Sequence, residues 1–376
     1  METLFKMRIE KIVNEIKKYF DVDVIALKSF DALSYLFADM YNPPPNELSI
    51  MYVIINTRTL EVTTYVSLLD YFRAIEYYGN TPTARFIPVF SSSLKLPDNV
   101  SVVSFEDMRR SIESTLNNAK VVASDNISSC ESRLCVNVKP IVDLVRRVKT
   151  DVEVSLIGEA IKITEKVLKE IPVLISPGIS EKEIAGKLIE LALNYGADGI
   201  AYSPIVAIGK NTAKPHHSPQ NKRFDGAEPI LIDFGVRFRG YVSDVTRIFI
   251  KKDLPPEYSE IHKYIELICN AIDAVASDLR PSVKASYLDS IARDVLKKEG
   301  IDQFFIHGLG HGIGVDVHEQ PRLSSNSTDI LMHGDVVTVE PGIYIYNKFG
   351  IRIEEDVYIN ESGGKILTSL PRVIYL

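Results

Sequence analysis

Acidic side chains inside apolar, strand-like segments are the feature that most constrains how this chain can fold. The run PILIDFGVRF carries Asp233 and the run GYVSDVTRIFI carries Asp244. The residues between them, Arg-Phe-Arg-Gly at 237–240, can form a turn. If the tip of that turn lies between Phe238 and Arg239, the two acids face each other across an antiparallel pair at about 4.5 to 5.5 Å. Like charges directly opposite destabilise a sheet, so this arrangement needs a cation.

The same arrangement recurs near the end of the chain, in DVVTVEPGIYIYNKFGIRIEEDVYI. Glu340 and Glu354 are each seven residues from Asn347, which stands in a turn-forming sequence. The sequence therefore predicts a second hairpin that pairs two carboxylates. Strand alternation predicts that one face carries Arg352, Glu354 and Asp356. Arg352 is then placed to hold a carboxylate of the site.

Five of the seven histidines lie in two short stretches, KPHH with His216 and His217, and HGLGHGIGVDVHEQP with His307, His311 and His318. The glycines at 308, 310, 312 and 314 predict a backbone that runs close to a metal or substrate. A dinucleotide-binding loop does not fit this spacing, and neither does the HExxH zinc motif.

Taken together, these motifs resemble the pita-bread metallopeptidases, which include methionine aminopeptidase, aminopeptidase P and prolidase. The HEQP segment and the preceding N-terminal region are most similar to the Xaa-Pro branch, prolidase and aminopeptidase P. The resemblance covers residues 140–376, with a looser likeness of the first 135 residues to the creatinase-type N-domain. It implies an α/β N-terminal domain followed by an α+β pita-bread (creatinase/aminopeptidase) catalytic domain.

The resemblance implies a centre of two divalent metal ions held by Asp233, Asp244, His311, Glu340 and Glu354. Asp244 and Glu354 would bridge the ions, and Glu340 would also accept the proton of the attacking water. Mn, Co and Zn all suit such ligands.

Four further side chains are expected around that centre. His216 and His318 match the histidines on the substrate side and would be catalytic together with Glu340. His307 and Arg352 are expected to support the ligands from behind. His217 is a weaker candidate, and the alternative for it is an exposed neighbour of His216.

Charge supports the metal prediction, because four carboxylates sum to −4 and two divalent ions restore neutrality. Two ions ~3.5 to 4 Å apart would lower the pKa of a bridging water from ~15.7 toward ~7. The implied activity is therefore a metal-dependent exopeptidase that cleaves the bond between an N-terminal residue and proline through a metal-bridged hydroxide. Its partners would be short proline-containing peptides, and we also expect a homodimer.

Two other functions remain open at this point. Methionine aminopeptidase shares the five ligands, although its simplest forms resemble the catalytic domain alone. A non-catalytic pita-bread binding protein would have replaced ligands, whereas all five are present here.

Periodicity divides the chain into two domains, residues 1–138 and 139–376. The first alternates short β-rich runs with a helix at Met7–Phe20 and another near Asp107–Asn118. The second begins with a helical stretch from Ile141 to Ile171, and a further helix opens at Ser180 with a capping box to Glu183.

Composition narrows the partners and the compartment. The formal net charge is −7 and basic clusters are absent from the sequence, which argues against nucleic acid and an anionic membrane as partners. The sequence has no long apolar run and no signal-peptide pattern at its start, so we expect a cytoplasmic protein. Cys130, Cys135 and Cys269 are too few for a disulfide framework, which fits a reducing compartment.

Overall fold

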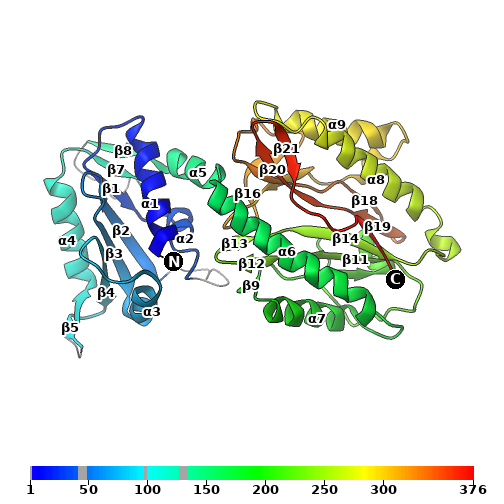
Figure 1. The fold of residues 1–376 in the computed structure, drawn as a ribbon, viewed down its shortest axis with the longest axis horizontal. Helices are drawn as coiled ribbons and strands as arrows, with labels where there is room; N and C mark the ends of the chain where they lie inside the picture. The colour runs from blue at the N-terminus through cyan, green and yellow to red at the C-terminus, as the bar shows by residue number, and fades with distance from the viewer. Residues whose placement is uncertain (1, 41–48, 97–99, 127–133) are drawn as a thin grey trace. The chain divides into compact units, whose positions relative to one another are not determined.

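The computed structural model describes residues 2–40, 49–96, 100–126 and 134–376. The chain forms two compact units, Met1–Arg146 and Arg147–Leu376 (Figure 1). The predicted boundary between residues 138 and 139 stays a prediction. Within the described ranges, none of the helices is long and apolar enough to cross a membrane.

The first unit is an α/β layer around a mixed sheet of order β5-β6-β4-β3-β2-β1-β7-β8. Its strands are β1 (Val24–Leu27), β2 (Ile50–Asn56), β3 (Val62–Ser67), β4 (Ala84–Phe90), β5 (Leu94–Lys95), β6 (Ser101–Ser104), β7 (Val122–Ser124) and β8 (Cys135–Asn137). Its helices are α1 (Glu2–Lys17), α2 (Phe30–Leu36), α3 (Leu68–Tyr78) and α4 (Phe105–Asn118). The predicted β-rich runs all form strands, whereas α2 and α3 were not predicted.

The cysteine prediction is corrected for one residue. Cys135 is disulfide-bonded, and Cys269 is free. Cys130 lies outside the described residues. The small number of cysteines therefore does not by itself indicate a reducing compartment.

The start of the second unit differs from the predicted continuous helix. The stretch from Ile141 to Ile171 is two helices, α5 (Lys139–Arg147) and α6 (Asp151–Leu174). Thr150 caps α6 in a capping box: the Thr150 hydroxyl accepts from the Glu153 N–H, and the Glu153 carboxylate accepts from the Thr150 N–H at 2.8 Å. The prediction failed because apolar spacing continues across this break, whereas α5 ends at Arg147 and the Thr150 cap begins a new helix.

The next helix of this unit begins where it was predicted to begin. The capping box of Ser180 and Glu183 is confirmed at the start of α7 (Glu181–Asn194). Two further helices follow, α8 (Ile261–Ala276) and α9 (Ala285–Lys297). Short 3-10 turns add η3 (Gly209–Ala213), η4 (Pro256–Tyr258) and η5 (Asp302–Phe304).

Four sheets complete the second unit, with orders β10-β11-β14-β22, β13-β12-β9, β16-β15-β17-β20-β21 and β18-β19. Their strands are β9 (Gly199–Ile200), β10 (Ile205–Ile208), β11 (Ile230–Phe234), β12 (Val236–Phe238), β13 (Tyr241–Val242), β14 (Val245–Ile250), β15 (Gly310–Gly312), β16 (Glu319–Leu323), β17 (Val336–Val339), β18 (Gly342–Ile345), β19 (Phe349–Arg352), β20 (Glu355–Asn360), β21 (Gly363–Ile366) and β22 (Val373–Tyr375).

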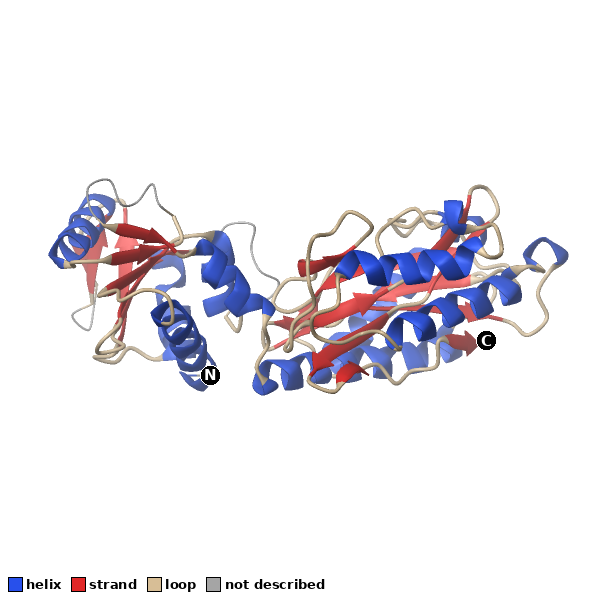
Figure 2. Cartoon of the chain, turned by 90° about the horizontal axis from the view of Figure 1, so that it is seen from above, coloured by secondary structure: helices blue, strands red, loops and turns tan. Residues whose placement is uncertain are grey.

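Helices cover the strands of this unit on both faces (Figure 2). Along β11, Ile230 and Ile232 pack into the core formed with α6 and α7, while Leu231 packs into the core formed with α8 and α9. Asp233 follows Leu231 on the second face. Both β11 and β14 contact β19, which ends at Arg352, and β14 also contacts β20, which follows Glu354.

Candidate metal centre

Asp233 and Asp244 come together, but not in the predicted register. Asp233 lies opposite Thr246 in the pairing of β11 with β14. The turn tip is Arg239–Gly240, where both residues have positive φ, 48° and 85°. The predicted direct pairing of the acids is therefore wrong by two residues. Asp244 is instead the diagonal neighbour of Asp233 on the same face of the sheet.

The second predicted hairpin is confirmed. The pairing of β18 with β19 and that of β17 with β20 share one register, which is symmetrical about Asn347. Glu340 and Glu354 lie between these two paired segments and are therefore opposite each other. Asn347 adopts the left-handed conformation, φ 59°, that the turn requires.

The predicted alternation around Glu354 is also confirmed. The Arg352 Nη2 donates to Asp233 Oδ2 at 2.6 Å, and Asp356 Oδ2 accepts from the Asp244 N–H at 3.1 Å. Glu355 points the other way, where its carboxylate binds two arginines, Arg247 and Arg372. One face of the strand thus serves the site, and the other face serves the surrounding core.

Two glycines of the histidine-rich segment, Gly308 and Gly310, line the cavity of the site, as their predicted close approach requires, and the segment's glycines also have a packing role. A Cβ at Gly310 would lie 2.1 Å from the Thr338 carbonyl oxygen, and one at Gly312 would lie 2.2 Å from the Gln320 carbonyl oxygen. At these two positions glycine allows β15 to pack tightly between its neighbouring strands. This packing holds His311, which lies between the two glycines.

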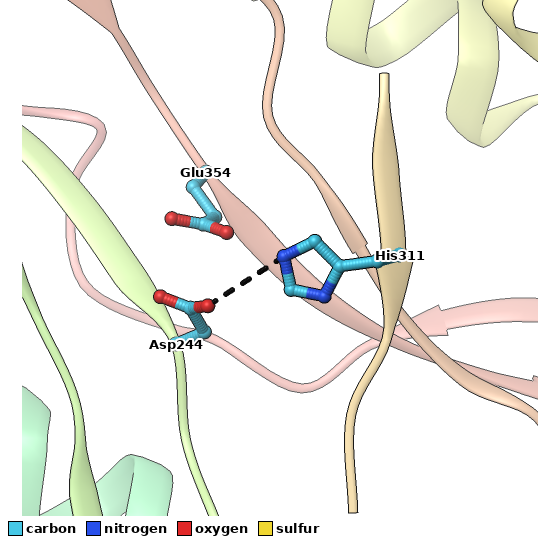
Figure 3. Close-up of side chains that lie close together, drawn as sticks. All are labelled: Asp244, His311 and Glu354. Carbon is cyan, nitrogen blue, oxygen red and sulfur yellow. Dashed lines mark ion pairs between the residues drawn. The ribbon is translucent and has the colours of Figure 1, made fainter. Parts of the chain in front are cut away.

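Three of the predicted ligands present their side-chain atoms to a common point. Ligand atoms of Asp244, His311 and Glu354 all lie within 4.8 Å of one another (Figure 3). The His311 Nε2 is 3.8 Å from Asp244 Oδ2 and 3.3 Å from Glu340 Oε1. The other His311 nitrogen, Nδ1, donates to the Gly312 carbonyl at 3.1 Å and so leaves Nε2 facing the acids.

Burial and neighbouring charges shift the pKa values of these groups. Burial and the nearby carboxylate of Asp233 raise the pKa of Asp244, and burial and Asp244 raise the pKa of Glu354. Burial alone would lower the pKa of His311, but its hydrogen bond to Glu340 and the charge of Glu340 raise it to about 9. The same contact lowers the pKa of Glu340 despite its burial.

Two observations test whether divalent ions fit these residues. The Tyr202 hydroxyl lies within hydrogen-bonding distance of both Asp233 Oδ1, at 2.5 Å, and Asp244 Oδ1. One phenolic proton serves one carboxylate at a time, so the second needs a further proton or a cation. Among the described residues Asp356 Oδ1 has no hydrogen-bond partner, and burial raises the pKa of Asp356 to about 8. Carboxylates and one imidazole crowded in this way fit divalent ions.

Arg352 and His307 belong to one hydrogen-bonded chain behind the acids. Arg352 Nη1 donates to the Tyr344 hydroxyl at 2.7 Å, and Tyr344 lies 3.0 Å from His307 Nε2. The His307 Nδ1 donates to the Gly308 carbonyl at 2.7 Å, so Nε2 is left to accept from Tyr344. Burial lowers the pKa of His307, which keeps the ring in this neutral state.

A cavity of about 810 Å³ opens over the acids. It is lined by all five predicted ligands and by His216, His307, His318 and Arg352. His216 and His318 are exposed, and the His318 ring lies 4.4 Å from that of His311. His217 is buried and 2.8 Å from Glu181, so both earlier readings of His217, substrate-side residue and exposed neighbour, are wrong.

Comparison with known proteins decides the family. A model of metallopeptidase family M24 matches residues 155–361. The chain belongs to metallopeptidase family M24. It is therefore a metallopeptidase that uses divalent metal ions, and the predicted resemblance is confirmed.

Relatives of this M24 peptidase include proteins named for both dipeptidase and aminopeptidase activity. The Xaa-Pro dipeptidase of Pyrococcus furiosus is 32% identical over 83% of this chain and 86% of that protein. The X-Pro aminopeptidase structure from Thermotoga maritima has a TM-score of 0.81 and 28% identity, covering 98% of this chain and 99% of that one. The prolidase structure from Pyrococcus horikoshii has a TM-score of 0.75 and 27% identity, covering 97% of this chain and 99% of that one. The predicted α/β N-terminal domain and pita-bread catalytic domain are thus confirmed as the fold.

Sequence reasoning missed Tyr202 and Thr246, which contact predicted ligands, and Tyr344, which contacts Arg352 and His307. The Thr246 hydroxyl donates to Glu354 Oε2 at 2.7 Å. Alternation was a signal that could have found Thr246, because it lies two residues after Asp244 and so on the same face of the sheet. Tyr202 lies in a segment whose sequence pattern carries no such signal.

Proposed function

We propose that the chain is an Xaa-Pro dipeptidase or aminopeptidase that removes an N-terminal residue from a following proline. The observation that carries the proposal is the set of four carboxylates and His311 that line the cavity, three of which converge on a common point. The names of the relatives supply the substrate class, because they are Xaa-Pro dipeptidase, X-Pro aminopeptidase and prolidase.

We assign two divalent ions, Mn, Co or Zn, to Asp233, Asp244, His311, Glu340 and Glu354. When bound, such ions act as Lewis acids that make water nucleophilic at neutral pH and polarise the substrate carbonyl. The neutralised charge offsets the repulsion that raises the pKa of Asp244 and of Glu354 in the metal-free site.

The chain's own residues then position the substrate and move protons. Glu340 is the proton acceptor, because its carboxylate borders the cavity and is ionised, its pKa being lowered by His311. His216 and His318 stand exposed on the cavity wall, where their N–H groups can donate to the scissile carbonyl oxygen. One well-aimed donor of this kind contributes about 3 to 4 kcal/mol to transition-state stabilisation.

A comparison of three peptides tests the function. Wild-type protein loaded with Mn or Co should hydrolyse an Xaa-Pro dipeptide or an Xaa-Pro-Yaa tripeptide faster than a Met-Ala peptide. Preference for the dipeptide identifies a dipeptidase, and preference for the tripeptide identifies an aminopeptidase. A preference for Met-Ala would establish methionine aminopeptidase activity instead, and no hydrolysis of any of them would support a binding protein. Exhaustive chelation should abolish turnover, and size-exclusion chromatography tests the homodimer that we also propose.

A further inference from the structure

Two consecutive histidines point in opposite directions at one wall of the cavity. His216 is exposed and lines the cavity with its neighbours Lys214 and Pro215. His217 is only 4% exposed and does not line it. The backbone direction at His217 therefore fixes where the His216 side chain can reach.

His217 is held by a carboxylate that organises the whole segment. Glu181, the first residue of α7, is completely buried. Its Oε1 accepts from the Ile208 N–H and the Asn211 side chain, each at 2.8 Å. Its Oε2 accepts from the Gln220 N–H and from His217 Nε2, also at 2.8 Å. One buried carboxylate thus ties both ends of the segment 208–220 to the start of α7.

The opposite side of this segment contacts the strands of the metal centre. The Thr212 hydroxyl accepts from the Gly350 N–H at 2.8 Å. The Pro215 carbonyl accepts from Arg352 Nη1 at 3.4 Å, and the same guanidinium binds Asp233. The segment is therefore fixed against the centre on one side and against Glu181 on the other.

We propose that Glu181 and His217 are positioning residues that hold His216 in place for the reaction. This inference rests on the proposed function of His216 as a donor to the substrate carbonyl. A carboxylate accepts hydrogen bonds only, so His217 donates to it through Nε2. The His217 ring thereby fixes the distance between Glu181 and the backbone next to His216. Loss of either partner leaves buried donors or an acceptor unpaired, and the segment must shift to satisfy them. A displacement of about 1 Å at a substrate-binding group lowers turnover by about 100-fold.

A double-mutant cycle on the metal-loaded enzyme separates positioning from general damage. On the preferred Xaa-Pro peptide, His216→Ala should lower kcat/KM by about 100-fold to 1,000-fold, as expected for loss of one donor. His217→Ala should lower it by about 10-fold to 100-fold, as expected for a displaced donor. The double variant should be no slower than His216→Ala alone, because His217 acts only through His216. His217→Gln should recover part of the rate, since its amide can still donate to Glu181. His262→Ala, on the exposed face of α8, is the matched control and should equal wild type.

Hydrogen exchange supplies a readout that does not depend on activity. In metal-loaded Glu181→Gln and His217→Ala, peptides covering residues 208–220 should exchange faster than in wild type, while peptides covering residues 355–366 stay protected. Additive rate losses in the cycle, or unchanged exchange at 208–220, would overturn the positioning role. A wild-type protein inactive on every Xaa-Pro peptide would instead refute the proposed function, and the exchange result would still decide whether Glu181 and His217 order the segment.

Discussion

Arg352 shows how one side chain can connect a strand to a charged centre. Its guanidinium is buried, donates to Asp233 and Tyr344, and lies 4.0 Å from Glu340 Oε2 through Nε. Burial alone would lower the pKa of Arg352, but Tyr344 and the surrounding carboxylates raise it. The charge is therefore permanent, and the planar fork fixes the direction of each hydrogen bond.

Arg352→Lys should lower metal affinity or turnover by about 10-fold to 100-fold, because lysine keeps the charge but loses the fork. Arg147→Lys is the matched control, since Arg147 also binds a buried carboxylate, Asp335, through two nitrogens but does not line the cavity. Metal titration and steady-state kinetics measure both variants. Equal behaviour of the two variants would show that Arg352 has no special role at the centre.

A second experiment distinguishes metal ligands from residues on the substrate side by comparing the metal content and turnover of two variants. Asp244→Ala should lose both bound metal and turnover, because it removes a carboxylate from the cluster with His311 and Glu354. His318→Ala should keep its metal content and lose mainly kcat, by about 100-fold to 1,000-fold for one oxyanion donor. Elemental analysis with kinetics distinguishes the two. Loss of a metal ion from His318→Ala would mean that His318 is a ligand.

Metal binding should release protons at neutral pH. In the metal-free protein the pKa of His311 is about 9 and that of Asp356 is about 8, so both groups are protonated at pH 7. A metal takes the neutral imidazole, so affinity should rise with pH from 6 and level off near pH 9, where His311 has already lost its proton. Calorimetry in phosphate and in Tris measures the released protons through the buffer dependence of the heat. A heat independent of the buffer would contradict this prediction.

At the scale of elements, each loop at the cavity is held by a charged residue outside it. Asp289 on α9 accepts from the Leu309 N–H at 3.1 Å, and Arg293 donates to the carbonyls of Phe305 and His307. Glu319 accepts from the N–H groups of Val315 and Asp316 and binds Lys149, which holds the loop that precedes His318.

Glu319→Gln tests the stability that this loop anchor provides. The side chains of Lys149 and Glu319 are 1% and 6% exposed, so the variant leaves an ammonium buried without its carboxylate. Breaking such a pair should lower the free energy of unfolding by about 3 to 5 kcal/mol. Glu190→Gln removes an exposed pair with Lys187 and should cost less than about 1 kcal/mol. Urea denaturation compares the two, and equal small losses would contradict the assignment.

Prediction from sequence succeeded where a local rule decides the outcome. The capping box at Ser180 and the hairpin centred on Asn347 depend on neighbouring residues, and both are confirmed. The first hairpin failed by two residues because Arg239 adopts the positive φ that glycine usually provides, which moves the turn along the chain. The start of α3 was missed because Ser67 both ends β3 and caps the helix, which leaves no spacer to mark the boundary.

The cavity itself was beyond local rules, because its walls come from segments far apart in sequence. Tyr202 reaches Asp233 and Asp244 across 31 and 42 residues, and Thr246 reaches Glu354 across 108. The five predicted ligands came from motif resemblance and strand alternation. Contacts such as those of Tyr202 and Glu181 depend on the order of strands and helices, which periodicity does not determine.

At the scale of the whole molecule, the second unit contains every residue that lines the cavity. It also has its own cores on the two faces of the sheet β10-β11-β14-β22. A fragment comprising residues 139–376, which starts at the predicted boundary, should therefore fold cooperatively and bind metal with the affinity of the full chain. Circular dichroism melting and calorimetric metal titration measure both properties.

Two ion pairs near the start of the second unit decide how short a stable fragment can be. A fragment comprising residues 151–376 lacks Arg147 and Lys149, whose partners Asp335 and Glu319 are buried or nearly so. Both carboxylates would then lack their cations, and each broken pair should cost about 3 kcal/mol or more. We expect the shorter fragment to melt well below the longer one or not to fold. If residues 139–376 fail to fold while the full chain is stable, the second unit needs the first, and the boundary predicted at residue 139 is wrong. If the two fragments melt together, α5 and the two ion pairs do not stabilise the catalytic unit.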